Sequence, residues 1–241
     1  MKHAREGGPV RYRARVEYDG TEFAGFQAQP GRRTVQGELE RAVAYLTGEP
    51  AIRIKAAGRT DAGVHATGQV IAITWPGGMT ASELGQAIGS LLPPDVAIGP
   101  LTRVALDFDP RRAATRREYR YSIWTGPRRP LANRYSYVLD ERLDAEAMHT
   151  AAQQLVGRHD FSAFGRVQRT SVRTLYEIRD RRRGHLVTID VTGDAFLHQM
   201  VRSIVAALVR IGMGRATSED LVSEMRSQGR AFDGAVVPAQ G

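Results

Sequence analysis

The sequence predicts an α+β fold in which two halves of one chain each follow the element order β-α-β-β-α-β. Apolar and polar residues alternate in the predicted strands, and apolar residues recur every three or four positions in the predicted helices. Glycine, proline and helix-capping residues separate these stretches. The order is that of a split β-α-β, or ferredoxin-like, unit. We expect the two halves to share one continuous, mostly antiparallel sheet.

The first half opens with a strand at residues 10–17, VRYRARVE. Its alternation predicts one apolar face and an outer face on which Arg11, Arg13 and Arg15 form a basic stripe. A loop at 18–33 follows. The remaining predicted elements are a helix capped by Thr34 and closed by Gly48 and Pro50, strands at 51–57 and 67–75, a helix with a Thr80–Glu83 capping box stopped by Pro93 and Pro94, and a strand at 95–104.

The second half repeats this order less cleanly. Its predicted elements are a strand at 116–125, a helix at 144–156, strands at 171–179 and 185–192 joined by a basic turn at 180–184, an apolar helix at 195–212 and a polar helix at 218–228. A last strand is needed to complete the pattern. The expected domain division is 1–106 and 107–241.

Composition favours a nucleic acid as the partner. The 241 residues include 34 basic and 26 acidic side chains, for a net charge of +8, and all the basic residues except Lys2 and Lys55 are arginine. A basic folded domain is typical of nucleic-acid binders, and the planar guanidinium suits phosphate. The absence of cysteine excludes disulfides and thiolate chemistry. No apolar run approaches the ~20 residues of a membrane span, so we expect a soluble, cytoplasmic protein.

The segment from Gly58 to His65, GRTDAGVH, is the strongest candidate for chemistry. Two glycines bracket Asp61, and Arg59 stands two residues before it, in a loop between two predicted strands. A neighbouring guanidinium favours the ionised form of a carboxyl, and a charged carboxylate suits nucleophilic attack better than proton donation. A plain Asp-Ala-Gly turn is the alternative interpretation.

Two further stretches carry unusual residues. In RREYRY, at 116–121, arginines alternate with tyrosines, so the arginines suit phosphates and Tyr119 offers a stacking face for a base. A core tyrosine pair with a solvated arginine edge is the alternative. Arg202 lies inside an otherwise apolar helix, where a charge needs a partner such as a carboxylate. An arginine that reaches solvent at the helix edge is the alternative there.

These stretches resemble the TruA-type tRNA pseudouridine synthases over nearly the whole chain. The matching segments are EYDGTEFAGFQAQ, TVQGELERAV, AGRTDAGVHATGQV, REYRY, DFSAF and GDAFLHQMVRSIVAALVRIG, in the family's order. The resemblance implies isomerisation of uridine to pseudouridine in the tRNA anticodon stem-loop, at positions 38 to 40. It also implies a homodimer, no metal or organic cofactor, helices on one face of the sheet and an active-site cleft on the other.

The resemblance also assigns roles to residues. It implies that Asp61 is the catalytic aspartate, that Arg59 assists base flipping and that Tyr119 packs on the target base. It implies that Arg202 pairs with the aspartate. Basic positions that it places on the RNA are Arg111 and Arg117.

The sequence departs from the family pattern in two places. The family's His-Ala-Arg-Phe-Ser run is replaced by residues 109–113, DPRRA, which keep the arginine and lose the histidine and the aromatic residue. Family members also continue past residues 239–241 into a hydrophobic strand.

Two other functions fit parts of the sequence. A catalytically silent RNA-binding module explains the charge and Tyr119 but gives the Asp61 loop no role. A metal-dependent nuclease would draw its ligands from His65 and the aspartates, but these acids lack metal-ligand spacing. The aspartates in question are Asp19, Asp61, Asp107 and Asp109. We expect His65 to be structural rather than a catalytic base.

Overall fold

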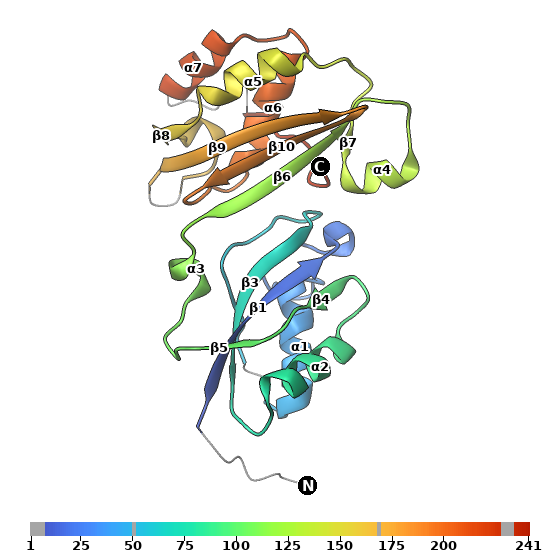
Figure 1. Cartoon of the computed structure of the whole chain (residues 1–241), viewed down its shortest axis with the longest axis vertical. Helices are drawn as coiled ribbons and strands as arrows, with labels where there is room; N and C mark the ends of the chain where they lie inside the picture. The colour runs from blue at the N-terminus through green and yellow to red at the C-terminus, as the bar shows by residue number, and fades with distance from the viewer. Residues whose placement is uncertain (1–7, 50–51, 168–169, 228–233) are drawn as a thin grey trace. The chain divides into compact units, whose positions relative to one another are not determined.

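The computed structural model describes residues 8–49, 52–167, 170–227 and 234–241. The chain folds as a mixed α+β protein with two compact units, Met1–Ala114 and Thr115–Gly241, and each unit has its own sheet (Figure 1). Within the described ranges, no helix is long and apolar enough to cross a membrane. Pro50, residue 51 and residue 228, which the sequence analysis assigned to element ends, lie outside the described residues.

The first unit follows the predicted order of strands and helices. Its elements are β1 (Val10–Tyr18), the short 3-10 helix η1 (Gly20–Glu22), α1 (Val35–Thr47), β2 (Lys55–Ala56), β3 (Ala66–Trp75), α2 (Ala81–Leu91), β4 (Val96–Ile98), β5 (Thr102–Val104) and α3 (Pro110–Ala113). The strand order is β2-β3-β1-β4, every pairing is antiparallel, and β5 also pairs with β1. The predicted strand at 95–104 is therefore two short strands. They are separated by Gly99, Pro100 and Leu101, and Pro100 has no N–H to donate to a ladder.

The core of the first unit lies between its sheet and the helices α1 and α2 (Figure 1). Both helices begin as the sequence predicts. The Thr34 side chain accepts a hydrogen bond from the backbone of Gly37, and Thr80 and Glu83 form the capping box. Val16, Leu39 and Ile71 are among the side chains fully buried between the two layers.

The outer face of β1 carries a shorter basic stripe than the sequence predicts. Arg13 and Arg15 are exposed, but Arg11 is buried. The Arg11 side chain donates hydrogen bonds to the Phe108 carbonyl at 2.7 Å and to Thr74 Oγ1 at 2.6 Å. The segment that follows β5 therefore covers this end of the strand, and Arg11 anchors that segment.

A second contact fixes the same segment to the first unit. Asp109 caps α3 by accepting hydrogen bonds from the backbone N–H groups of Arg111 and Arg112, and its other oxygen lies 3.2 Å from Lys55 Nζ. The boundary between the units therefore falls at 114/115, eight residues beyond the expected division at 106/107.

The Asp109→Ala variant should lower the free energy of unfolding of the protein by about 1 kcal/mol, the usual cost of losing an N-cap. Burial opposes ionisation of Asp109, but its hydrogen bonds with Lys55, Arg111 and Arg112 outweigh it and lower its pKa. Its contribution is therefore present above the pKa of an unfolded aspartate and is lost as the pH falls through the folded value. Urea unfolding at pH 7 and at pH 3 checks this, and a deficit of the variant that is as large at pH 3 as at pH 7 would contradict it.

The second unit contains β6 (Arg117–Trp124), α4 (Pro130–Tyr135), β7 (Tyr137–Val138), α5 (Ala145–Gln153), β8 (Gly157–Asp160), the 3-10 helix η2 (Ser162–Phe164), β9 (Val172–Arg183), β10 (Leu186–Gly193), α6 (Met200–Gly212) and α7 (Ser218–Arg226). Its strand order is β7-β6-β10-β9-β8. The helices α5, α6 and α7 lie on one side of this sheet (Figure 1). Ile123, Ile189 and Ile204 are completely buried in the core that the helices close.

One prediction about the whole chain and two about the second half are wrong. The described strands form two hydrogen-bonded sheets rather than one. Their edges consist of strands of two to four residues, which are too short to continue a ladder. The basic stretch 180–183 extends β9 instead of forming the turn, which is centred on Gly184 with a φ of +59°. The apolar helix begins at Met200 rather than at 195, because Gln199 takes a left-handed conformation.

Candidate active site

Asp61 opens a tight turn between β2 and β3. The backbone N–H of Val64 donates to the Asp61 carbonyl at 3.2 Å, and Gly63 has a φ of +79°. Glycine takes this conformation without strain, so the turn matches the Asp-Ala-Gly pattern in the sequence. The loop is joined to the sheet at its base, where Gln69 Nε2 donates to the Gly58 carbonyl at 3.0 Å. The turn fixes the backbone of Asp61 relative to the sheet.

The loop at 18–33 holds the Asp61 turn from the other side. The Phe26 N–H donates to the Thr60 carbonyl at 3.1 Å, and the Gly63 N–H donates to the Phe23 carbonyl at 3.4 Å. These two bonds lie on either side of Asp61 in the sequence. The aspartate therefore stands in backbone that a second loop clamps at both ends.

Two glycines let the loops approach this closely. A Cβ atom on Gly20 would lie 2.1 Å from the carbonyl oxygen of Val64. A Cβ on Gly25 would lie 2.9 Å from that of Thr60, and Gly25 has a φ of +100°. The neighbouring atoms are backbone, which cannot rotate away. Glycine is therefore required at both positions, Gly20 for space and Gly25 for space and conformation.

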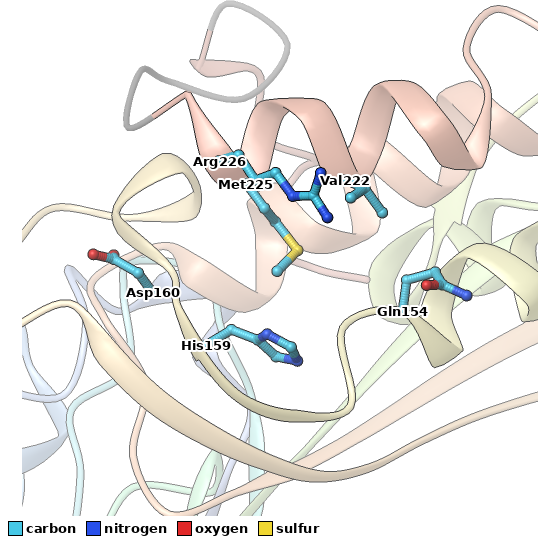
Figure 2. A pocket seen from close by; sticks show the side chains of 6 residues that line it. All are labelled: Gln154, His159, Asp160, Val222, Met225 and Arg226. Atoms are coloured by element: carbon cyan, nitrogen blue, oxygen red, sulfur yellow. The ribbon is translucent and has the colours of Figure 1, made fainter.

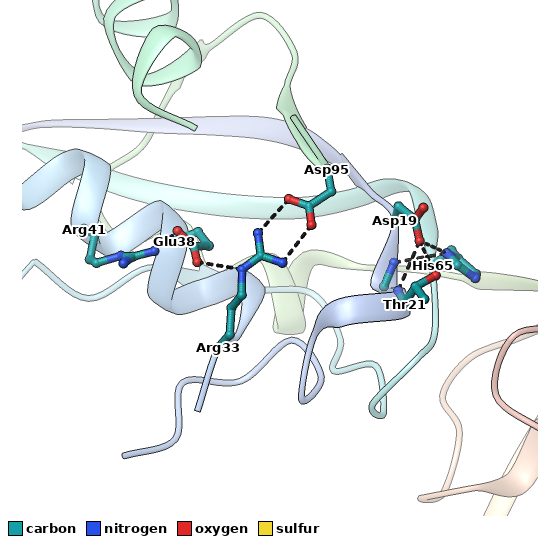
Figure 3. Close-up of polar contacts among 8 residues, drawn as sticks. Asp19, Thr21, Arg33, Glu38, Arg41, His65 and Asp95 are labelled. Atoms are coloured by element: carbon teal, nitrogen blue, oxygen red, sulfur yellow. Dashed lines mark hydrogen bonds and ion pairs between the residues drawn. The ribbon is translucent and has the colours of Figure 1, made fainter. Parts of the chain in front are cut away.

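His65 joins the two loops. Its Nδ1 accepts a hydrogen bond from the Gly20 N–H at 3.0 Å. Asp19 Oδ1, which accepts hydrogen bonds from the backbone and hydroxyl of Thr21, lies 3.1 Å from the same nitrogen (Figure 3). This environment favours the structural role expected for His65.

An ion cluster fixes the far end of the 18–33 loop. Arg33 makes two hydrogen bonds of 2.8 Å to the Asp95 carboxylate, and its Nε lies 3.3 Å from Glu38, which also contacts Arg41 (Figure 3). The Asp95 hydrogen bond raises the pKa of Arg33. The guanidinium also lies 4.1 Å from the ring centre of Phe23, whose carbonyl holds Gly63. The sequence analysis missed this cluster, because Asp95, which binds Arg33 at its centre, lies 62 positions further along the chain.

In the second unit, Tyr119 lies on β6 beside an aromatic partner. Its ring meets that of Phe196 edge to face, with ring centres 5.0 Å apart and planes at 77°. Tyr119 alternates in phase with Tyr121 and Ile123, which are buried. The three side chains therefore share one face of β6. Tyr119 itself is half-buried, so it lies at the border of the core.

Arg117 and Arg202 are both tied to backbone carbonyls. Arg117 Nη1 donates to the Asp194 carbonyl at 2.6 Å, and Arg202 Nε donates to the Val237 carbonyl at 2.8 Å. Next to this contact, the Tyr121 hydroxyl donates to the Pro238 carbonyl at 2.8 Å, and burial raises the pKa of that hydroxyl above its usual range. Residues 237 and 238 therefore connect β6 to α6.

The expected site residues divide between the two units. Asp61 and Arg59 share one loop in the first unit, where Arg59 is exposed and Asp61 half-buried. Arg111 lies on α3 of the same unit. Tyr119, Arg117 and Arg202 belong to the second unit. Among the described residues, no group of three or more histidine, aspartate or glutamate side chains is arranged to hold a metal ion.

The second unit has a pocket of about 440 Å³, and none of these residues lines it (Figure 2). Its lining comes from α7, β8 and the end of α5: Gln154, His159, Asp160, Val222, Met225 and Arg226. His159 Nε2 lies 3.0 Å from the Val156 carbonyl, and Asp160 accepts a hydrogen bond from the Ser162 N–H at 2.8 Å. His159 and Asp160, the two groups capable of acid–base chemistry, are thus bound to neighbouring backbone groups. Neither Tyr119 nor Arg202 lines the pocket.

Comparison with known proteins assigns the chain to a protein family. A family model described as tRNA pseudouridine synthase matches residues 14–111 and 151–241, which is more than half of the chain. The protein therefore belongs to the tRNA pseudouridine synthase family.

Individual relatives match this chain over nearly its full length. The protein named tRNA pseudouridine synthase A of Solidesulfovibrio magneticus is 43% identical, and the match covers 96% of this chain and 88% of the relative. Proteins of the same name from Thermosipho africanus and Geotalea uraniireducens are 41% and 39% identical. These matches cover 96% of each chain for the first, and 94% of each chain for the second. A chain of a solved Cbf5-Nop10-Gar1 complex is 12% identical, and the alignment covers 88% of this chain and 55% of that chain. Its TM-score of 0.33 is too low to carry an argument.

Proposed function

We propose that this protein isomerises uridine to pseudouridine in the anticodon stem-loop of tRNA, at positions 38 to 40. The observation that carries the proposal is the identity of 39 to 43% over nearly the whole chain to proteins named tRNA pseudouridine synthase A. The clamped loop that presents Asp61 supports it, because a rigid backbone suits a group that must meet its target with little reorganisation.

Asp61 is the nucleophile in this proposal. The target uridine is stacked in a stem, so it must flip out of the helix before the carboxylate can reach it, at a cost of a few kcal/mol. Asp61 then attacks the nucleotide and the bond between N1 and C1′ breaks. The uracil turns, C5 bonds to C1′, and the bond between the nucleotide and the Asp61 carboxylate breaks, which restores the free carboxylate. The proton leaves C5 and N1 gains one, so the reaction is a balanced isomerisation. Attack at C1′ and attack at C6 both fit these residues, and a glycal route, in which Asp61 would act as a base instead, is the alternative.

The remaining site residues support that step. Arg59, on the same loop, assists flipping of the base and holds the carboxylate. By the family resemblance, Arg202 is the residue that pairs with the catalytic aspartate, and its Nε bond to the Val237 carbonyl supports this role by holding the guanidinium in a fixed place on α6. Arg111 and Arg117 contact the RNA backbone.

Tyr119 packs on the target base. Its edge-to-face contact with Phe196 supports this, because it holds the tyrosine ring in one orientation. A stacking face of this kind is worth roughly 1–3 kcal/mol per base.

We also propose that both units derive from one ferredoxin-like pattern. The first has the order β2-β3-β1-β4, all antiparallel. In the second, β9-β10-β6 takes the place of β2-β3-β1, with α5 and α6 in the places of α1 and α2. The short parallel strand β7 lies beside β6 where β4 lies beside β1. In this proposal the active-site cleft lies on the face of a sheet opposite to its helices.

From the family resemblance, we further propose that the protein works as a homodimer in the cytoplasm. Sedimentation equilibrium at micromolar concentration tests the dimer, and a single species of 26.5 kDa would contradict it.

The proposed reaction is tested by incubating an unmodified tRNA transcript with the protein in EDTA, digesting the RNA to nucleosides and measuring pseudouridine by chromatography. Pseudouridine must rise while total uridine falls by the same amount, because the reaction is an isomerisation. Cleaved RNA without EDTA and intact RNA with it would instead support the nuclease.

Tyr119→Phe should keep near-normal turnover, and Tyr119→Ala should lower it about 10- to 100-fold, because only the second change removes the stacking ring. Single-turnover product formation at saturating tRNA checks both variants. Equal losses would assign the role to the hydroxyl instead of the ring.

A further inference from the structure

A basic and aromatic surface lies at the end of β6 opposite to Tyr119. We call it the distal patch and define it by Trp124, Arg128, Arg129, Arg181 and Arg183. All four arginines are exposed and Trp124 is half-buried. The patch belongs entirely to the second unit.

The register of the sheet places three members of the patch on one face. Trp124 pairs with Leu186, and Leu186 pairs with Arg183, so these three form one cross-strand row. Arg181 lies in the next row, opposite Thr188. The intervening residue Val187 is buried in the core on the other side. The two arginines therefore point away from the helices, because side chains alternate across a sheet.

The segment after β6 adds two more arginines. The Arg129 guanidinium lies 5.3 Å from the ring centre of Trp124, and Trp124 Nε1 donates to the Pro127 carbonyl at 2.9 Å. The helix α4 that follows buries none of its residues, and Leu131 is 82% exposed. This segment therefore stands on the surface with Arg128 and Arg129 at its start.

Two acidic groups of this face are bound by other arginines. Asp190 is held by Arg120 through bonds of 2.6 and 2.9 Å. Glu177 contacts Arg179. Among the described residues, the side chains of Arg128, Arg181 and Arg183 make no hydrogen bond or ion pair. The patch is thus a concentration of positive charge beside an aromatic ring.

Such a surface fits a polyanion with stacking groups, and RNA is the one this protein meets if the proposed function holds. Tyr119 and Trp124 are five residues apart on one strand, or about 17 Å at the usual rise. We propose that the distal patch binds the phosphate backbone of the tRNA substrate several nucleotides away from the uridine that reacts. This inference rests on the proposed function.

The test compares two double variants with a matched control. Arg181→Gln/Arg183→Gln and Arg128→Gln/Arg129→Gln each remove two charges from the patch. Arg142→Gln/Arg226→Gln removes two exposed charges beside α5 and on α7, on the helical side of the unit. The measured quantities are the Kd for a whole tRNA transcript across a salt series and the single-turnover rate at saturating tRNA.

Each patch variant should raise Kd roughly tenfold at low salt and make the slope of log K against log salt shallower by about 1.4 to 1.8, the value for two lost phosphate contacts. The rate at saturation should stay unchanged, since the patch does not touch the reacting base. An unchanged Kd and slope, or an equal effect in the control variant, would overturn the proposal. Pseudouridine formation by the wild type on the same transcript separates this failure from a failure of the proposed function.

Discussion

The Asp61→Ala variant should lose turnover by on the order of 10³-fold or more and still bind tRNA with nearly the wild-type Kd. The reason is that the carboxylate supplies the bond-forming atom, whereas phosphate contacts supply most of the affinity for RNA. Asp61→Asn, which keeps the size of the side chain, should lose as much, because the amide is a poor nucleophile. Single-turnover assays on a tRNA transcript, together with filter binding, measure both quantities.

Asp107→Asn is the matched control for this experiment. Asp107 is an exposed aspartate of the same unit, and it follows β5 rather than lying in the Asp61 loop. It should keep its turnover. Turnover by Asp61→Asn close to that of the wild type would remove the aspartate from its proposed role.

The Gly20→Ala variant should lower turnover by about 100-fold, although Gly20 carries no functional group. Its new Cβ would lie 2.1 Å from the Val64 carbonyl oxygen, so the two loops must separate. A displacement of about 1 Å can cost a catalytic group on the order of 10² in rate. The added crowding should also lower the free energy of unfolding by about 1–3 kcal/mol. Thermal unfolding and single-turnover kinetics check the two effects separately.

Gly68→Ala provides the control. Gly68 lies on β3 of the same unit, and a Cβ built there meets no atom within 4 Å. Turnover and stability should both stay near those of the wild type. If Gly20→Ala matched Gly68→Ala in turnover, the close approach of the loops would have no part in positioning Asp61.

Helix starts are the part of the fold that local sequence predicts best. Thr34 and Thr80 were expected as N-caps, and both accept hydrogen bonds from the first turn of their helices. These contacts span three residues, so the pattern of a few neighbouring side chains suffices. The start of α6 shows the limit. Nothing local indicates that Gln199 would take a left-handed conformation and delay the helix to Met200.

Long-range contacts account for the errors. Alternation placed Arg11 with Arg13 and Arg15 on an open face, but the segment around Phe108 folds over it. The sequence carries no sign of that contact, which joins residues 97 positions apart. The prediction of a single shared sheet was wrong for a similar reason. Tertiary packing decides which strands pair at the edge of a sheet.

In the candidate site, too, local features could be predicted and long-range contacts could not. The Asp61 turn could be predicted, because its glycine and its strand neighbours are local features. The clamp on that turn could not, since Gly20 and Gly25 look like ordinary loop glycines until the Val64 and Thr60 carbonyls are placed beside them.

The most direct test of the account is to map pseudouridine in unmodified tRNA transcripts by carbodiimide labelling and primer extension. The transcripts are treated in EDTA with the wild type or with Asp61→Ala. The account predicts reverse-transcriptase stops at positions 38 to 40 with the wild type and none with the variant. No stops with either protein, together with tight tRNA binding, would contradict it and would support an RNA-binding module without catalytic activity.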